Sequence, residues 1–212
     1  MAPRYDLLNS LLSLGQDNRW RRKAAEMVVP AAGERFLDLA AGTGAFSRAL
    51  HAAQPAVRIV AADFCVPILR RMPAGVAHRI GSDALRLPFR AGAFDGFVVA
   101  FGVRNFADPA RALAELRRVL RPSGRGLILE FMRPERSWFG AAYRLYLGLW
   151  VPFLGGLCSG SFGAYRHLTR TVRSFFTRDE FVSLLAGAGF SVVARREMTA
   201  GAATAFLVQK DS

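Results

Sequence analysis

The sequence has few lysines, cysteines, histidines and acidic residues. Its 29 basic residues include only two lysines, Lys23 and Lys210, and they stand against 16 acidic residues and three histidines. The two cysteines, Cys65 and Cys158, are far apart and neither belongs to a CxxC pair. We therefore expect neither a disulfide framework nor a zinc site, and we place the protein in a reducing compartment. The histidines show no metal-ligand spacing, so no metal is expected.

Long apolar runs are also missing. The first residues contain no apolar stretch typical of a signal peptide. The most apolar segment, residues 141–157, is short for a bilayer span and is interrupted by Arg144 and Pro152. The sequence therefore predicts a cytoplasmic protein without a membrane-spanning helix. It leaves room for peripheral contact with the inner face of the plasma membrane.

What the sequence does have is apolar residues and positive charge. Of its 212 residues 52% are hydrophobic, and the formal net charge is +13. This length and composition predict one domain, residues 1–212, with a large core. The charge indicates an anionic partner, which can be nucleic acid, a membrane surface or an acidic ligand.

Apolar stretches and amphipathic stretches alternate between residues 36 and 130. This pattern predicts an α/β fold with a parallel sheet. The expected strands are 36–39, 57–62, 77–80, 96–101 and 126–130, and the expected helices are 46–53, 67–72 and 109–120. A turn is expected at residues 122–124.

The C-terminal part has a different pattern. Thr177 and Glu180 form a capping-box signature for a helix that continues to Ala186. Residues 191–197 and 203–209 then predict two strands with a short connection, which makes them antiparallel. The expected sheet is a parallel core with a C-terminal antiparallel hairpin, unlike the plain dinucleotide-binding arrangement.

Three segments at successive strand ends predict a nucleoside site. Gly42 and Gly44 allow a tight turn and a close approach of the backbone to a ligand. Asp63, at the end of the second strand, can accept hydrogen bonds from both ribose hydroxyls. Residues 83–84, after the third strand, can flank an adenine. NAD and S-adenosylmethionine both fit this pattern, but Ser47 replaces the third glycine of GxGxxG, which favours adenosylmethionine together with the hairpin.

The glycine segment, Leu37-Asp-Leu-Ala-Ala-Gly-Thr-Gly44, resembles motif I of class I adenosylmethionine-dependent methyltransferases, which have a Rossmann-like sheet. Further segments resemble one branch, the quinone C-methyltransferases of menaquinone and ubiquinone biosynthesis. They are Tyr5-Asp-Leu-Leu-Asn9, Phe101-Gly-Val-Arg-Asn105, Arg118-Val-Leu-Arg-Pro-Ser-Gly-Arg125 and Leu129-Glu-Phe131. The resemblance covers nearly the whole chain.

The resemblance implies a set of residues that contact S-adenosylmethionine. They are Asp38, Gly42, Thr43, Gly44, Asp63, Asp83, Ala84 and Ala100. Within this set we expect Asp38 to support the loop. The sequence departs from the family at three positions, where Ala100 replaces a common serine, Ala45 a common aspartate and Ser123 a common glycine.

The acceptor site is expected beside the end of the fourth strand. Arg104 can stabilise a developing phenolate, and Asn105 can orient a hydroxyl group. Tyr5 joins them if the N-terminal helical segment, residues 1–30, folds over the site as a lid, as the resemblance implies. For the proton acceptor two hypotheses remain: a water held by Arg104, and His167. Guanidinium does not deprotonate readily, so Arg104 is not expected to act as a base itself.

The segment of residues 136–176 is expected to be a substrate- or membrane-facing insertion. No acidic residue occurs between Glu135 and Asp179, whereas six arginines and ten aromatic residues do. Such a composition suits an apolar channel next to anionic headgroups. It also suits RNA, but no Asn-Pro-Pro motif of base methylation follows the fourth strand and no RNA-binding domain is appended. We therefore expect a membrane rather than nucleic acid.

Together these features predict C-methylation of a prenylated hydroquinone by S-adenosylmethionine. Demethylmenaquinol is the first choice and the benzoquinol of the ubiquinone pathway the second. Two alternatives remain open. One is methylation of another lipophilic phenol or natural product, and the other is a catalytically weak protein of the same fold that acts as a scaffold for quinone-pathway enzymes.

Overall fold

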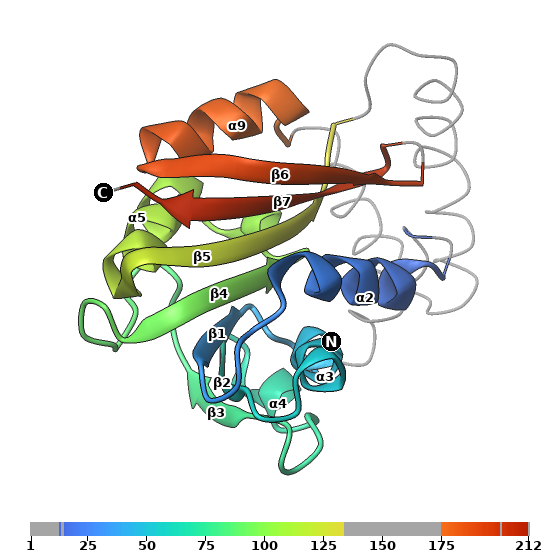
Figure 1. Cartoon of the computed structure of the whole chain (residues 1–212), viewed down its shortest axis with the longest axis vertical. Helices are drawn as coiled ribbons and strands as arrows, with labels where there is room; N and C mark the ends of the chain where they lie inside the picture. The colour runs from blue at the N-terminus through green and yellow to red at the C-terminus, as the bar shows by residue number, and fades with distance from the viewer. Residues whose placement is uncertain (1–12, 14, 134–174, 200, 212) are drawn as a thin grey trace.

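The computed structural model describes residues 13, 15–133, 175–199 and 201–211 (Figure 1). These residues form a seven-stranded sheet with the order β3-β2-β1-β4-β5-β7-β6. The strands are β1 (Arg35–Leu39), β2 (Arg58–Asp63), β3 (His78–Gly81), β4 (Phe94–Ala100), β5 (Leu120–Phe131), β6 (Phe190–Met198) and β7 (Ala203–Lys210). Strands β1 to β5 are parallel, and β7 pairs antiparallel with both β5 and β6. The predicted parallel core with a C-terminal antiparallel hairpin is confirmed.

Helices cover both faces of this sheet. They are α2 (Asp17–Val28), α3 (Ala45–Ala53), α4 (Val66–Leu69), α5 (Pro109–Val119) and α9 (Arg178–Gly187), with a short 3₁₀ turn η1 (Val103–Asn105) after β4. One face carries α2, α3 and α4, and the other carries α5 and α9 (Figure 1). Of the expected lid, residues 1–30, the structure describes residues 13 and 15–30, which include α2. The expected insertion lies outside the described residues except for Phe175 and Phe176.

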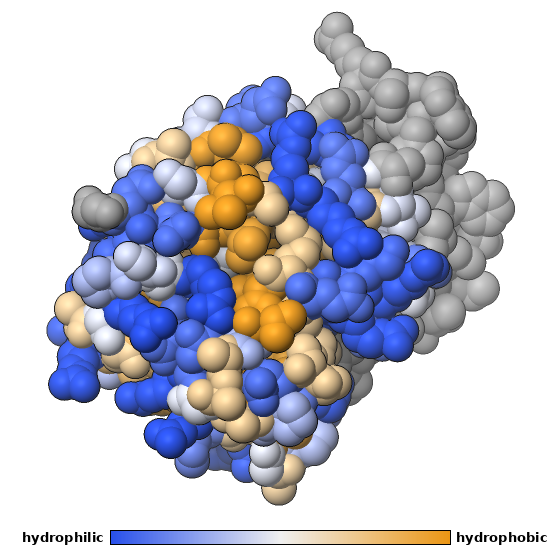
Figure 2. Space-filling model, viewed as in Figure 1, coloured by the Kyte–Doolittle hydropathy of each residue, from blue (hydrophilic) through white to orange (hydrophobic). Residues whose placement is uncertain are grey.

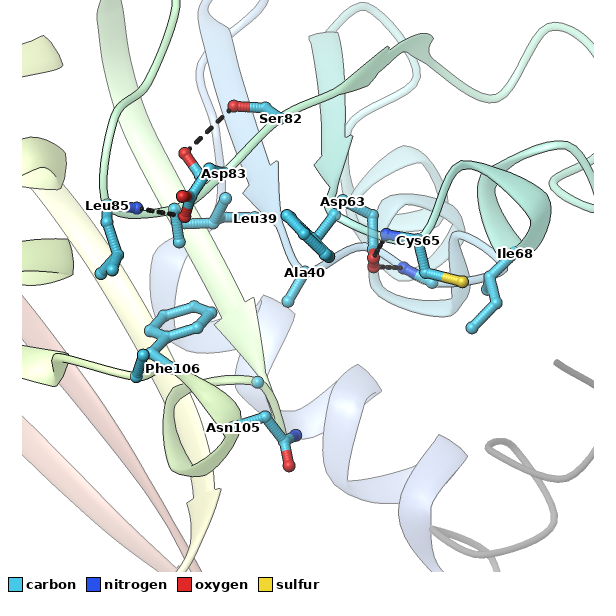
Figure 3. A pocket seen from close by; sticks show the side chains of 15 residues that line it. Leu39, Ala40, Asp63, Cys65, Ile68, Ser82, Asp83, Leu85, Asn105 and Phe106 are labelled. Carbon is cyan, nitrogen blue, oxygen red and sulfur yellow. Dashed lines mark hydrogen bonds between the residues drawn. The ribbon is translucent and has the colours of Figure 1, made fainter. Parts of the chain in front are cut away.

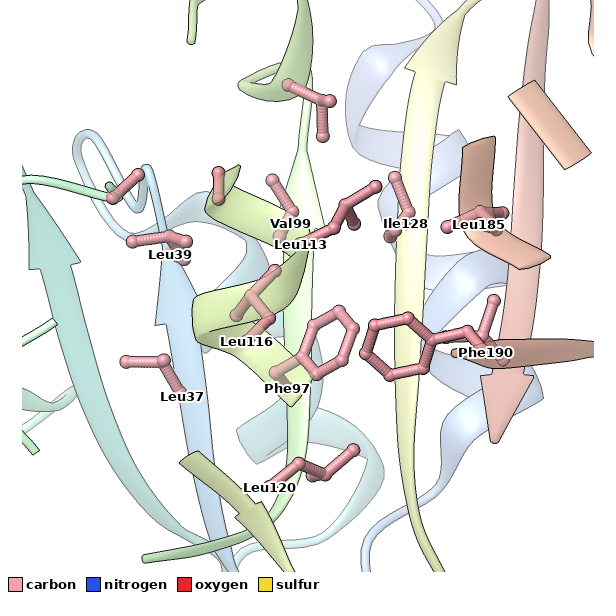
Figure 4. Packing of buried hydrophobic residues seen from close by; sticks show 14 of the residues in the cluster. Leu37, Leu39, Phe97, Val99, Leu113, Leu116, Leu120, Ile128, Leu185 and Phe190 are labelled. Carbon is pink, nitrogen blue, oxygen red and sulfur yellow. The ribbon is translucent and has the colours of Figure 1, made fainter. Parts of the chain in front are cut away.

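The larger of the two main cores lies between the sheet and the helices α5 and α9 (Figure 4). Leu113 and Leu116 of α5 are fully buried against β4, as their spacing of three residues predicts for one face of a helix. Phe97 of β4 meets Phe190 of β6 edge-to-face, with ring centroids 5.7 Å apart. Close packing of this kind makes the sheet a rigid base for the loops at its edges.

Two glycines let aromatic rings lie flat on neighbouring strands. A Cβ atom on Gly96 would lie 2.3 Å from the ring of Phe36, and one on Gly126 would lie 2.2 Å from the ring of Phe97. Both distances are far below van der Waals contact. The rings of β1 and β4 therefore occupy the space that a side chain would fill, which explains glycine at these sites inside strands.

Helix α9 begins with the capping box that the sequence predicts. The Thr177 hydroxyl accepts from the backbone N–H of Glu180 at 3.3 Å, and the Glu180 carboxylate accepts from the N–H of Thr177 at 2.8 Å. These bonds satisfy two N–H groups that the first helical turn leaves without partners. Gly189, with φ of +77°, then turns the chain into β6.

Strand β5 is longer than the sequence predicts. The expected turn at residues 122–124 lies inside the strand as an irregularity: Leu120 pairs with Phe94, and the register resumes at Arg125, which pairs with Gly96. Ser123 adopts a φ of +57°, a left-handed conformation that favours glycine. The Pro-Ser-Gly segment thus distorts the strand locally instead of forming a turn between elements. After this distortion the chain pairs with β4 again.

The surface carries some apolar side chains. Figure 2 shows them gathered in a strip across the sheet beside α2, bordered by hydrophilic side chains. The large apolar residues exposed in the described part of the chain are Val29, Phe64, Val66 and Val193. None of the helices among the described residues has the length and hydropathy that a bilayer span requires.

Candidate functional site

A cavity of about 590 Å³ opens at the carboxyl ends of strands β1 to β4 (Figure 3). This size is ordinary for a small-molecule site, and the carboxyl edge of an open parallel sheet is where such sites form. The residues that line it come from the loops after these strands: Leu39, Ala40, Gly42, Asp63, Phe64, Cys65, Ile68, Ser82, Asp83, Ala84, Leu85, Gly102, Asn105, Phe106 and Ala107.

The glycine loop after β1 forms one wall of the cavity. Gly42 and Gly44 have φ of +56° and +77°, and Gly44 directly precedes α3. A Cβ atom on Gly44 would lie 2.7 Å from the Met72 side chain. Glycine is therefore required at this position both for its backbone conformation and for space. Of this loop Gly42 lines the cavity, whereas Thr43 and Gly44 do not.

Asp63, the last residue of β2, connects the loop after β1 with the loop after β2. Its Oδ2 atom accepts from the N–H of Gly42 at 2.9 Å, and its Oδ1 atom accepts from the N–H of Cys65 at 2.8 Å. The carboxylate is half-buried and faces the cavity (Figure 3). A carboxylate has about four acceptor positions, so two remain for a ligand.

Beyond Asp63 the cavity has mainly apolar walls. Asp83 and Ala84 line it after β3, and the Asp83 carboxylate accepts from the N–H of Leu85 at 2.9 Å. Phe64 and Phe106 provide aromatic surfaces, and 82% of Phe64 is exposed. Such walls suit a flat heterocycle with a polar edge. The sequence-based prediction missed Phe64 and Phe106, although each follows soon after the end of a strand.

Asp38 lies behind the glycine loop and does not line the cavity. Its Oδ2 atom accepts from the N–H and the hydroxyl of Ser47, at 3.0 and 2.6 Å. The residue is 1% exposed, and burial raises the pKa of its carboxyl to about 6 although both Ser47 bonds act in the opposite direction. In this structure Asp38 therefore fixes the start of α3, which agrees with the expected supporting role.

This raised pKa predicts how Asp38 affects stability. An acid whose pKa is higher in the folded state stabilises the fold when protonated, and this contribution is lost as the pH rises from about 4 to about 6. We expect the free energy of unfolding of the wild type, relative to that of Asp38→Asn, to fall by roughly 3 kcal/mol over this range. Urea unfolding at a series of pH values measures it. Other titrating groups cancel in the difference, so a flat difference would contradict the prediction.

The loop after β4 carries the residues expected at the acceptor site. Asn105 lines the cavity, and its Nδ2 atom donates to the Phe101 carbonyl at 3.4 Å. Arg104 does not line the cavity: it is buried and its guanidinium pairs with Glu130 of β5. Ala100 also lies outside the lining and packs against the core. Tyr5 and His167 lie outside the described residues, so their roles stay predictions.

The chain segments that follow β1 and β4 come close together where they line the cavity. Ala40 and Phe101 both have left-handed φ values, +56° and +58°. Gly102 follows Phe101, and a Cβ atom on Gly102 would be 2.6 Å from that of Ala40. Backbone strain of this kind is common where a fold positions a binding site.

Comparison with solved structures shows the fold. A SAM-dependent methyltransferase from Aquifex aeolicus superposes with a TM-score of 0.69 at 15% identity, covering 96% of this chain and 97% of that one. The [4+2]-cyclase SpnF superposes with a TM-score of 0.70, also at 15% identity, covering 92% and 80%. The same fold thus supports different chemistries, and these likenesses alone do not assign one.

Comparison with known sequences is more specific. The model of the ubiE/COQ5 methyltransferase family matches residues 1–210. A demethylmenaquinone methyltransferase from Thermus thermophilus is 50% identical over 198 residues, covering 91% of this chain and 90% of that one. A ubiquinone/menaquinone biosynthesis C-methyltransferase from Geotalea uraniireducens is 38% identical, covering 99% and 93%. The resemblance seen in the sequence is confirmed, and the chain belongs to the ubiE/COQ5 methyltransferase family.

Proposed function

We propose that the protein transfers a methyl group from S-adenosylmethionine to a ring carbon of a prenylated hydroquinone, most directly demethylmenaquinol. The observation that carries the proposal is the cavity at the ends of β1 to β4, with Asp63 on one side and Asn105 on the other. Similar relatives support it: their names include menaquinone whether or not ubiquinone is also named. Both groups of names include menaquinone, which favours demethylmenaquinol as the acceptor.

The residues of the cavity fit the cofactor. The two acceptor positions left on Asp63 suit the hydroxyls of a ribose. Phe64 and Leu85 provide apolar walls for an adenine, and Asp83 provides an acceptor near its edge. Gly42 and Gly44 let the backbone approach the amino-acid part closely. When bound, S-adenosylmethionine supplies an electrophilic methyl group on its sulfonium.

The acceptor must be the reduced quinol, because a quinone ring is electron-poor. A new carbon–carbon bond forms at the ring carbon while the carbon–sulfur bond breaks, and its electron pair stays on sulfur. The ring carbon then loses its hydrogen as a proton, so the reaction releases one proton in all. A positioned donor beside the ring hydroxyl lowers the barrier by stabilising the phenolate that develops there.

We assign the role of this donor to the loop after β4. Asn105 faces the cavity and can orient the hydroxyl, and Arg104 is adjacent to it at the same edge of the sheet. Its guanidinium is buried and paired with Glu130, so it supports this turn from behind the cavity. Holding both partners in line contributes up to about 7–11 kcal/mol to lowering the barrier.

The membrane is the second proposed partner. The support for it is the composition of residues 136–178, which contain six arginines and no acidic residue. We expect binding to vesicles that contain anionic lipid, and we expect it to weaken at high salt. Cosedimentation with anionic and neutral vesicles at two salt concentrations tests this. Equal binding to both kinds of vesicle would contradict it.

Purified protein, methyl-labelled S-adenosylmethionine and demethylmenaquinol kept reduced test the proposed reaction. Mass spectrometry should find one added methyl group on the ring, and the oxidised quinone should give none. A benzoquinol of the ubiquinone pathway and a simple lipophilic phenol distinguish the substrate classes. Cofactor binding without transfer to any prenylated quinol would refute the proposal and favour the scaffold alternative.

A further inference from the structure

A fully buried ion pair lies beside the cavity, at the carboxyl ends of β4 and β5. The Arg104 and Glu130 side chains are both 0% exposed, and Nη1 of Arg104 donates to Oε1 of Glu130. Glu130 is on β5, whereas Arg104 is in η1, the turn that follows β4. The pair therefore connects the loop of the acceptor site to a strand in the middle of the sheet.

Glu130 also holds the backbone of this loop. Its Oε2 atom accepts from the N–H of Arg104 at 3.3 Å, and its Oε1 atom accepts from the N–H of Phe131 at 2.9 Å. One carboxylate thus fixes both the main chain and the side chain of Arg104. The next residue, Asn105, is the one that faces the cavity.

Two aromatic rings restrict the guanidinium further. The Cζ atom of Arg104 lies 5.2 Å from the ring centroid of Phe131 and 5.8 Å from that of Phe101. The two rings are themselves in contact, with centroids 4.6 Å apart. Cation–π contacts and the ion pair together leave the guanidinium little freedom.

Stability alone is a weak reason for such a pair. Moving two charges out of water is costly, and apolar residues of similar volume often serve the fold as well or better. A buried pair at the edge of a binding cavity therefore suggests a role in geometry. A displacement of about 1 Å at a reacting centre can lower the rate about 100-fold.

We propose that Glu130 is a positioning residue for methyl transfer: it holds Arg104 and the turn Val103–Asn105 in the geometry that the acceptor requires. The proposal rests on the proposed function, because it assumes that this loop meets the quinol. It assigns Glu130 no contact with substrate or cofactor. Glu130 acts mainly through the Arg104 guanidinium, so most of its effect on the reaction should be lost when Arg104 is replaced.

A double-mutant cycle tests this dependence. We expect Glu130→Gln to lower kcat about 100-fold while the dissociation constant for S-adenosylmethionine changes by less than about threefold. In an Arg104→Gln background the same substitution should change kcat by less than about threefold. Effects that simply multiply, or an unchanged kcat in folded Glu130→Gln, would overturn the proposal.

Glu34→Gln is the matched control. Glu34 likewise accepts from an arginine, Arg125, at 2.6 Å and from a backbone N–H, that of Ala31, at 2.7 Å, but it precedes β1 at the opposite edge of the sheet. We expect the Glu34→Gln variant to have the same kcat as the wild type. If kcat falls equally in both variants, the effect is general destabilisation and the proposal fails.

Amide hydrogen exchange separates this proposal from the proposed function. We expect faster exchange at the N–H groups of Arg104 and Phe131 in Glu130→Gln, whatever the acceptor is. If the wild type methylates no prenylated quinol, the proposed function fails, and the exchange data still decide whether Glu130 holds the loop. Should Glu130→Gln not fold, the double variant without either charge provides the exchange measurement. Unchanged exchange at the N–H group of residue 104 would overturn the proposal.

Discussion

Asp63→Asn should weaken binding of S-adenosylmethionine about 100-fold, which corresponds to about 3 kcal/mol. The carboxylate faces the cavity with two acceptor positions free, and each hydrogen bond to a charged group contributes about 1.5–3 kcal/mol. An amide has one oxygen, so its NH₂ group must face either the ligand or one of the N–H groups of Gly42 and Cys65. Isothermal titration calorimetry with the cofactor and its demethylated product measures the change.

Asp95→Asn provides the matched control for this substitution. Asp95 also holds a backbone group, accepting from the N–H of Arg35 at 2.7 Å, and it pairs with Arg121. It lies where β4 begins, at the edge of the sheet opposite the cavity. We expect Asp95→Asn to leave cofactor affinity within about threefold of wild type, since it changes nothing that lines the site. An Asp63→Asn variant with wild-type affinity would show that the cavity holds its ligand in another way.

Gly102→Ala should damage both the fold and the site. The new methyl group would lie 2.6 Å from the Cβ atom of Ala40 and 3.3 Å from a methyl group of Val99. Ala40 has no flexible side chain that could move away, so the ends of β1 and β4 must separate. Overpacking of this kind costs about 1–3 kcal/mol of the free energy of unfolding. Because Ala40 and Gly102 both line the cavity, we also expect cofactor affinity to fall about tenfold.

Thermal unfolding and calorimetry measure these two effects, and Gly187→Ala is the control. A Cβ atom on Gly187, in the last turn of α9, would meet nothing within 4 Å. Alanine favours helices over glycine by about 1 kcal/mol, so this variant should be slightly more stable than wild type. If Gly102→Ala is as stable as Gly187→Ala and binds the cofactor as tightly, the close contact between Gly102 and Ala40 constrains neither the fold nor the site.

The strand ends were predictable from sequence because their signals are local. Asp63 follows an apolar run directly, and the carboxyl ends of parallel strands share one edge, so its position in the site follows from the fold class. The capping box of Thr177 and Glu180 is equally local, since both partners lie within one turn.

The surroundings of Arg104 were not predictable in the same way. The sequence places it correctly after β4, but the left-handed φ of Phe101 changes the direction of the chain just before it. The partner of Arg104, Glu130, is 26 residues away on another strand. An expected guanidinium in the cavity therefore became a buried ion pair beside it, because tertiary contacts decide where a long side chain points.

The position of β7 in the sheet has a consequence for how the chain folds. Strand β7 follows β6 in the sequence but lies between β5 and β6. When the chain emerges from the ribosome, β6 therefore has no strand to pair with until β7 has also emerged. The edge of β5 stays open meanwhile, and an unpaired strand edge with an apolar run such as Leu127–Leu129 can bind other chains. Formation of the sheet thus depends on pairings distant in sequence, which are slow to form.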